Sequence, residues 1–165
     1  MTQLIEVTTN EVISGVCRAI YNQFGSAISI YKEKQPHMKL PAVSVYCINH
    51  TQQMERYDSY TNIFNIIINY FPDDSVTINN NRADMFSKAV KIMECIRYIE
   101  LPSQIRNASG EFEYSTLPSR ASDLASEEVE RFIQISATYT IRTRKYNQTN
   151  KFCEDLQINI ELGKK

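Results

Sequence analysis

The sequence has few of the residues, and none of the motifs, on which catalytic and metal sites usually depend. It contains no tryptophan, 4 glycines and only 2 histidines, His37 and His50, and neither histidine has a cysteine, histidine or carboxylate at metal-ligand spacing. The motifs of serine hydrolases, phosphate-binding loops, dinucleotide-binding folds and zinc proteases are all missing. These absences argue against a conventional enzyme.

The charge balance and the short apolar runs exclude two further classes of protein. The 18 basic and 19 acidic residues leave a net charge of -1, without the basic field of a dedicated nucleic-acid-binding protein. No apolar run approaches the ~20 residues that a membrane span needs, and the start, MTQLIEVTTNE, has no signal-peptide pattern. We therefore expect that the protein does not contact a membrane and that it assembles in a cytoplasm. Four cysteines without a CxxC pair are predicted to be free thiols: Cys17, Cys47, Cys95 and Cys153.

The segment Ser59–Phe71, SYTNIFNIIINYF, predicts one long central β-strand. Its alternation gives one fully apolar face, typical of a strand half-buried against a helix layer. That face carries Phe64, Ile66, Ile68 and Tyr70. Asn65 and Asn69 interrupt the other face, and each amide would need hydrogen-bond partners in a dry core. The second face is therefore predicted to be wet, or to contact something polar such as another subunit.

Two amphipathic helices are predicted around this strand. A capping box at Thr8 and Glu11 begins the first helix, and Gly25 ends it. The second helix runs from the asparagines at 79–81 to about Tyr98. Its predicted buried stripe consists of Phe86, Ala89, Val90, Met93 and Ile96.

The remaining strands complete an α+β prediction. They are Ala27–Lys32, Ala42–Asn49, Gln104–Leu117, Arg131–Arg144 and Asp155–Leu162. Gln52–Asp58 is predicted as a charged hairpin, and the polar segment Pro118–Glu130 as a flexible loop or one helical turn. The order α-β-β-β-α-β-β-β predicts a single domain, residues 1–165. Its sheet is largely antiparallel, with both helices packed on one face.

Several segments resemble the tail terminator proteins of phages and phage-tail-like particles from Gram-positive bacteria. They are LIEVTTNEVISGVCRAIYNQF, IYKEK, QPHMKLPAVSVYCI and RYDSYTNIFNIIINYFP. The resemblance implies a structural, non-enzymatic subunit without a cofactor, located in the virion tail at its head-proximal end. Such a subunit would assemble in the bacterial host cytoplasm as a hexameric ring on the last ring of the tail tube protein. It would end tube polymerisation and offer a docking surface to the neck, collar or head connector, with the sheath as a further neighbour.

The resemblance also implies contacts between copies, because each patch in a cyclic ring meets a different patch on the next subunit. The predicted subunit interface contains Asn65 and Asn69 on the central strand, and Tyr139 and Arg142 on the strand Arg131–Arg144. A small basic group has two interpretations, an ordinary solvated loop or a surface facing the lumen, where DNA at most passes through. That group consists of Arg144, Lys145 and Lys151.

Two other functions remain open from the sequence. Another head-to-tail joining protein of the neck would share this α+β architecture. A small metal-dependent enzyme would need carboxylates that converge on an ion. The candidate carboxylates are Asp73, Asp74, Glu127, Glu128 and Glu130.

Overall fold

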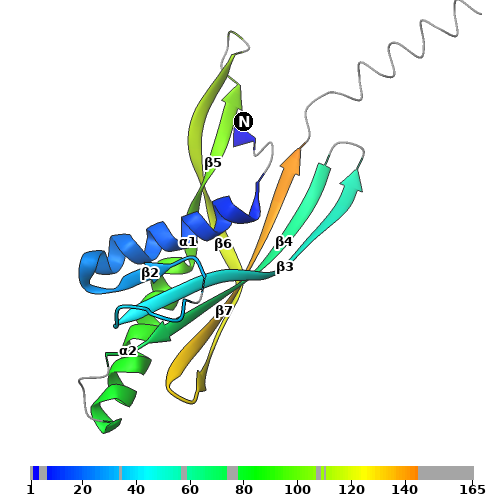
Figure 1. Cartoon of the computed structure of the whole chain (residues 1–165). Helices are drawn as coiled ribbons and strands as arrows, with labels where there is room; N and C mark the ends of the chain where they lie inside the picture. Colours follow the sequence, from blue (N-terminus) through cyan, green and yellow to red (C-terminus); the bar gives the residue numbers. More distant parts are fainter. Residues whose placement is uncertain are drawn as a thin grey trace, which may run out of the picture.

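A computed structural model describes residues 2–3, 7–33, 35–56, 59–73, 78–106, 109 and 111–144. These residues form an α+β fold with a mostly antiparallel, curled sheet (Figure 1). The elements are β1 (Thr2–Gln3), α1 (Thr9–Phe24), the 3-10 helix η1 (Gly25–Ala27), β2 (Ser29–Tyr31), β3 (Ala42–Arg56), β4 (Ser59–Phe71), α2 (Ile78–Ile96), β5 (Tyr98–Arg106), β6 (Phe112–Val129) and β7 (Phe132–Arg144).

The strands follow the order β1-β5-β6-β7-β4-β3-β2 across the sheet. Among the described strands, β2 and β3 form the one parallel pair. The predicted fold class and the order α-β-β-β-α-β-β-β are confirmed, with the short β1 added before α1. The predicted strand Asp155–Leu162 lies outside the described residues. That residues 1–165 form a single domain stays a prediction.

The first helix begins and ends as predicted. The Thr8 backbone N–H donates to Oε2 of Glu11 at 2.7 Å, and the Glu11 N–H donates to Oγ1 of Thr8 at 3.3 Å. This capping box satisfies two N–H groups that the first turn leaves without helical partners. Gly25 follows the helix with φ 58°, a left-handed conformation that costs glycine least.

Both helices pack on the same face of the sheet, as predicted. The apolar side of β4 and the apolar residues of β3 and β7 form the core with them. The buried core residues of β4 and β7 are Phe64, Ile66, Ile68, Tyr70, Ile133, Ile135, Ala137, Tyr139 and Ile141. Gly15 lets α1 lie close to β5, because a Cβ atom there would stand 3.2 Å from the carbonyl oxygen of Glu100.

The buried side of α2 is narrower than predicted. Its fully or nearly buried residues are Met85, Ala89, Ile92 and Ile96. Phe86 and Val90 are each 50% exposed, so the prediction that they are buried is wrong. Each lies about 100° around the helix from the buried residue before it. Because α2 rests on the sheet by one side only, its next side stays in solvent.

The chain after α2 also departs from the prediction. Gln104–Leu117 is not one strand, and Pro118–Glu130 is not a loop, because these segments contain the end of β5 and nearly all of β6. β6 pairs with β5 through its first half and with β7 through its second half. The Ala121 N–H donates to the Arg97 carbonyl at 2.9 Å, so the backbone groups of odd-numbered residues in this part of β6 point toward β5. The nitrogen of the even-numbered Pro118 therefore points away from β5, where no hydrogen bond to β5 is lost. A polar segment with a proline can therefore form this strand.

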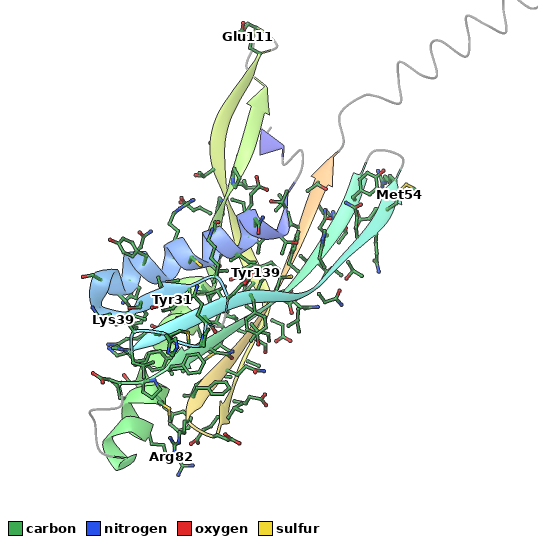
Figure 2. The ribbon with its side chains drawn as sticks, in the orientation of Figure 1. Tyr31, Lys39, Met54, Arg82, Glu111 and Tyr139 are labelled. Carbon is green, nitrogen blue, oxygen red and sulfur yellow. The ribbon has the colours of Figure 1, made fainter. Side chains whose placement is uncertain are left out.

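β3 is longer than predicted. The sequence predicts a strand over Ala42–Asn49 and a hairpin over Gln52–Asp58, whereas β3 continues to Arg56 and pairs with β4 over its length. The β3–β4 hairpin therefore extends well past the helices, and the labelled Met54 lies near its tip (Figure 2).

Candidate interaction surface

Neither helix covers the face of the sheet opposite the core, which we call the outer face. On the central strands β3, β4 and β7, outward positions alternate with core positions. The register of these strands places the following residues on the outer face: Ser44, Tyr46, Asn49, Thr51, Gln53, Thr61, Ile63, Asn65, Ile67, Asn69, Gln134, Ser136, Thr138, Thr140 and Arg142. Asn65 and Asn69 thus share this face with Arg142, as the alternation in the sequence predicts.

Charge is absent from the central part of the outer face, where the positions named above on β3 and β4, and residues 134–140 on β7, are all uncharged. The charged positions lie at the margins: Arg56 and Arg142 toward the end of the β3–β4 hairpin, and Asp123 and Glu127 on β6. The Nε of Arg142 lies 3.4 Å from Oε2 of Glu55. Depletion of charge marks the centre of protein–protein interfaces. The central part of the outer face therefore has the composition of a surface that another protein covers.

The two outer-face asparagines of β4, Asn65 and Asn69, differ in how accessible they are. Asn65 is half-buried and its Oδ1 accepts a hydrogen bond from the Thr138 hydroxyl at 2.9 Å. Asn69 is only 4% exposed, and its Nδ2 donates to the Tyr46 hydroxyl at 3.5 Å. The Oδ1 of Asn69 and the hydroxyl of its cross-strand neighbour Ser44 have no hydrogen-bond partner within the described residues. A partner would thus contact Asn65 directly and Asn69 mainly through the side chains above it.

Tyr139 lies in the core, so its predicted place in an interface is wrong. Its side chain is fully buried, and its hydroxyl donates to the carbonyl oxygen of Ile96 at 2.6 Å (Figure 2). It pairs with Phe64 across the β4–β7 ladder and therefore points toward the helices. The alternation of Ile133, Ile135 and Ile141 with polar residues is the signal that identifies this side of β7 as apolar.

The predicted basic group is described only in part. Arg142 is exposed at the rim of the outer face and pairs with Glu55, which also accepts a hydrogen bond from Thr61. Arg144 is the last residue of β7, and Lys145 and Lys151 lie outside the described residues. A lumen-facing role for these three residues stays a prediction.

Two of the carboxylates considered as metal ligands bind neighbouring side chains. Arg82 of α2 forms a salt bridge with Glu128 at 3.1 Å, and Glu127 accepts from Gln134 at 3.4 Å. Within the described ranges, no three histidine, cysteine or acidic side chains lie close enough together to hold a metal ion. The described helices include none that is long and apolar enough to cross a membrane.

A polar cluster that the sequence did not reveal stiffens the projecting end of the sheet. Asn62 is 2% exposed, its Oδ1 accepts from Nε2 of Gln52 at 3.0 Å, and its Nδ2 donates to the Thr143 hydroxyl at 2.9 Å. The His50 ring stacks on Phe64, with 4.2 Å between the ring centroids. Because these contacts join β3, β4 and β7, the hairpin is a braced extension of the sheet.

Burial raises the pKa of three groups at the contact between α2 and the sheet. The pKa of the Cys95 thiol rises to about 11 because burial disfavours the thiolate. Burial likewise raises the pKa of Tyr139 well above its ordinary value. The pKa of Tyr70 is raised by burial and by Asp84, whose carboxylate accepts a hydrogen bond from the Tyr70 hydroxyl at 3.2 Å.

These shifts predict that the free energy of unfolding falls as the pH rises above about 9. The unfolded chain releases these protons near the ordinary pKa values of 9.0 for cysteine and 10.0 for tyrosine, whereas the folded chain retains them. The stabilisation is thus fully present below pH 9.0 and is lost as the pH passes through the raised values. Urea denaturation at increasing pH measures the slope, and Tyr139→Phe should make it shallower. An identical slope in that variant would contradict the assignment.

The sequence profile of a family described as phage tail terminator protein matches residues 11–151. No curated protein matches the chain. Within the described residues, the matched range includes nearly all of α1 and the whole of β3, β4 and β7, so it covers the core and the outer face together.

Proposed function

The chain belongs to the phage tail terminator protein family, and from this premise we propose that six copies form a ring that closes the tail tube. The ring ends tube polymerisation and offers a docking surface to the neck, the collar or the head connector. Members of this family are structural, non-enzymatic components of the phage tail that associate with the tail tube. The metal-dependent enzyme considered from the sequence is therefore not retained.

The outer face is the observation that carries this proposal. It is a broad sheet surface with neither α1 nor α2 over it, and its charged positions on the described strands lie at the margins, away from the centre. Serine, threonine and asparagine side chains there are already partly paired within the face, as Asn65 is with Thr138. Covering such a surface costs less desolvation than covering charges. We assign the outer face, with Asn65, Asn69 and Arg142, to contacts between neighbouring copies of the ring.

The basic residues at the end of β7 belong to the same proposal. We assign Arg144, Lys145 and Lys151, which follow Arg142 in the sequence, to a surface that faces the lumen. Lysine and arginine attract phosphates regardless of base sequence, which suits a passage for DNA. The near-neutral total charge fits a weak contact that lets DNA pass.

Mixing the purified protein with growing tail tubes tests the proposed function directly. We expect electron microscopy to show a ring at one end of each tube, and tube lengths to stop increasing when the protein is added. The physical reason is that a terminal ring covers the surface to which the next tube ring would bind. Tubes that lengthen at an unchanged rate would contradict termination. Binding to a portal or connector but not to tubes would instead identify another joining protein of the neck.

A further inference from the structure

In the part of the chain that the structure describes, one edge of the sheet has no paired strand along most of β3. β2 pairs with β3 only at Ala42, Val43 and Ser44, whereas β3 continues to Arg56. Beyond Ser44, no strand in the described part of the chain pairs with β3 on the side away from β4. An unpaired edge presents a row of N–H and C=O groups on which another strand can form.

The hydrogen-bond alternation identifies which backbone groups face this open edge. The Ser29 N–H donates to the Pro41 carbonyl at 3.0 Å. The backbone N–H and C=O groups of odd-numbered residues at the start of β3 therefore point toward β2. A register shift between Cys47 and Asn49 moves this alternation by one residue. After the shift, the backbone N–H and C=O groups of even-numbered residues point to the open edge, in the plane of the sheet and away from β4. These residues are His50, Gln52 and Met54.

This open edge lacks two of the residue types that commonly prevent strand addition, proline and lysine. The segment from Val45 to Met54 contains neither. Ile48 and Met54 on this segment are 62% and 69% exposed. The β5–β6 hairpin differs, because its strands contain Pro102 and Pro118. The β3 edge is thus both rigid, through the Asn62 cluster, and open to a further strand.

A second open edge lies on the opposite side of the same sheet. The second half of β6 pairs with β7 on one side, and no strand among the described residues pairs with it on the other. The Thr138 carbonyl faces β6, since it accepts from the Ser122 hydroxyl at 3.0 Å. Because the direction of the backbone groups alternates along a strand, the N–H and C=O groups of Leu124, Ser126 and Glu128 point away from β7, toward the open edge. This segment also contains no proline and no lysine.

We propose that the β3 edge at His50–Met54 of one subunit pairs with the β6 edge at Leu124–Glu128 of the next subunit. The occupant of each edge is thus a second copy of this chain, and the inference rests on the proposed ring. The two edges are different and lie at opposite sides of β6-β7-β4-β3, so the contact is heterologous and repeats around a closed ring. When the ring closes, each of these edges has a paired strand. A β-barrel likewise has no unpaired edge, because its sheet closes on itself. The outer face then continues from one subunit to the next.

Proline substitutions with matched alanine controls test this pairing. Gln52→Pro and Gln52→Ala both remove the side chain that binds Asn62, but only proline removes the outward N–H. Ser126→Pro and Ser126→Ala form the equivalent pair on β6. We expect both proline variants to form no rings on tail tubes at concentrations up to about tenfold above those that wild type needs. The alanine variants should form rings, and circular dichroism checks that all four are folded.

Mixing the two proline variants tests which edges meet. Each retains one intact edge of the pair, so the mixture should give a dimer in sedimentation experiments that neither variant gives alone. Rings formed by either proline variant as readily as by its alanine control would overturn the pairing, and so would a mixture that stays monomeric. Wild-type protein that forms no ring with tubes would instead show that the proposed function itself is wrong.

Discussion

Asn65→Lys combined with Ser136→Lys is expected to abolish ring formation on tail tubes while leaving the subunit folded. Asn65 is half-buried and Ser136 exposed, so the monomer can keep both ammonium groups in water. In the ring, the outer face is covered, and two unpaired positive charges there would each cost several kcal/mol. Because the contact repeats around the ring, we expect complete loss. Electron microscopy of tubes mixed with the variant measures it.

Asn22→Lys combined with Gln23→Lys provides the matched control. Both residues are exposed on α1, away from the outer face, and the pair adds the same two charges. Equal loss of rings in the two double variants would show that net charge, and not the outer face, controls assembly. Asn69 is a poorer choice for this test, since a lysine at a side chain only 4% exposed would also destabilise the monomer.

Tyr139→Ala is expected to lower the free energy of unfolding of the monomer by about 3–5 kcal/mol. The ring of Tyr139 is fully buried between the sheet and α2, so its removal leaves a cavity. Tyr139→Phe should cost about 1–2 kcal/mol, because the Ile96 carbonyl loses its 2.6 Å hydrogen bond while the ring stays in place. Urea denaturation of the purified subunit measures both values.

Tyr21→Ala is the control for this series. Tyr21 is 59% exposed on α1, and its removal should change the free energy of unfolding by less than about 1 kcal/mol. If Tyr139→Ala unfolded like Tyr21→Ala and failed only in ring assembly, Tyr139 would belong to an interface after all. That result would contradict its place in the core.

The elements that the sequence predicts well are those whose pattern is local. The bounds of β4 agree with the predicted strand Ser59–Phe71, because alternation and the following Pro72 both act within a few residues. The first helix agrees for the same reason, since Thr8 and Glu11 form a capping box within one turn. The family resemblance drawn from these segments is confirmed by the match over residues 11–151.

The predictions that are wrong depend on neighbours distant in the chain. The second half of β6 is polar and alternates weakly, and it becomes a strand because β7 pairs with it. Phe86 and Val90 have the right spacing for a buried stripe, but the width of that stripe depends on how α2 rests on the sheet. An apolar residue on a helix is therefore not by itself a core residue.

The sequence alone determined the class of this protein, its central strand, the side of that strand that is apolar and the asparagines on the other side. These follow from periodicity, which each segment carries by itself. Only the tertiary structure decided that Tyr139 belongs to the core and that the centre of the outer face is uncharged. It also decided that, among the described residues, β3 and β6 each leave an edge without a paired strand. Such properties arise when strands far apart in the chain pair, because the order and register of a sheet decide which groups it covers and which it leaves open.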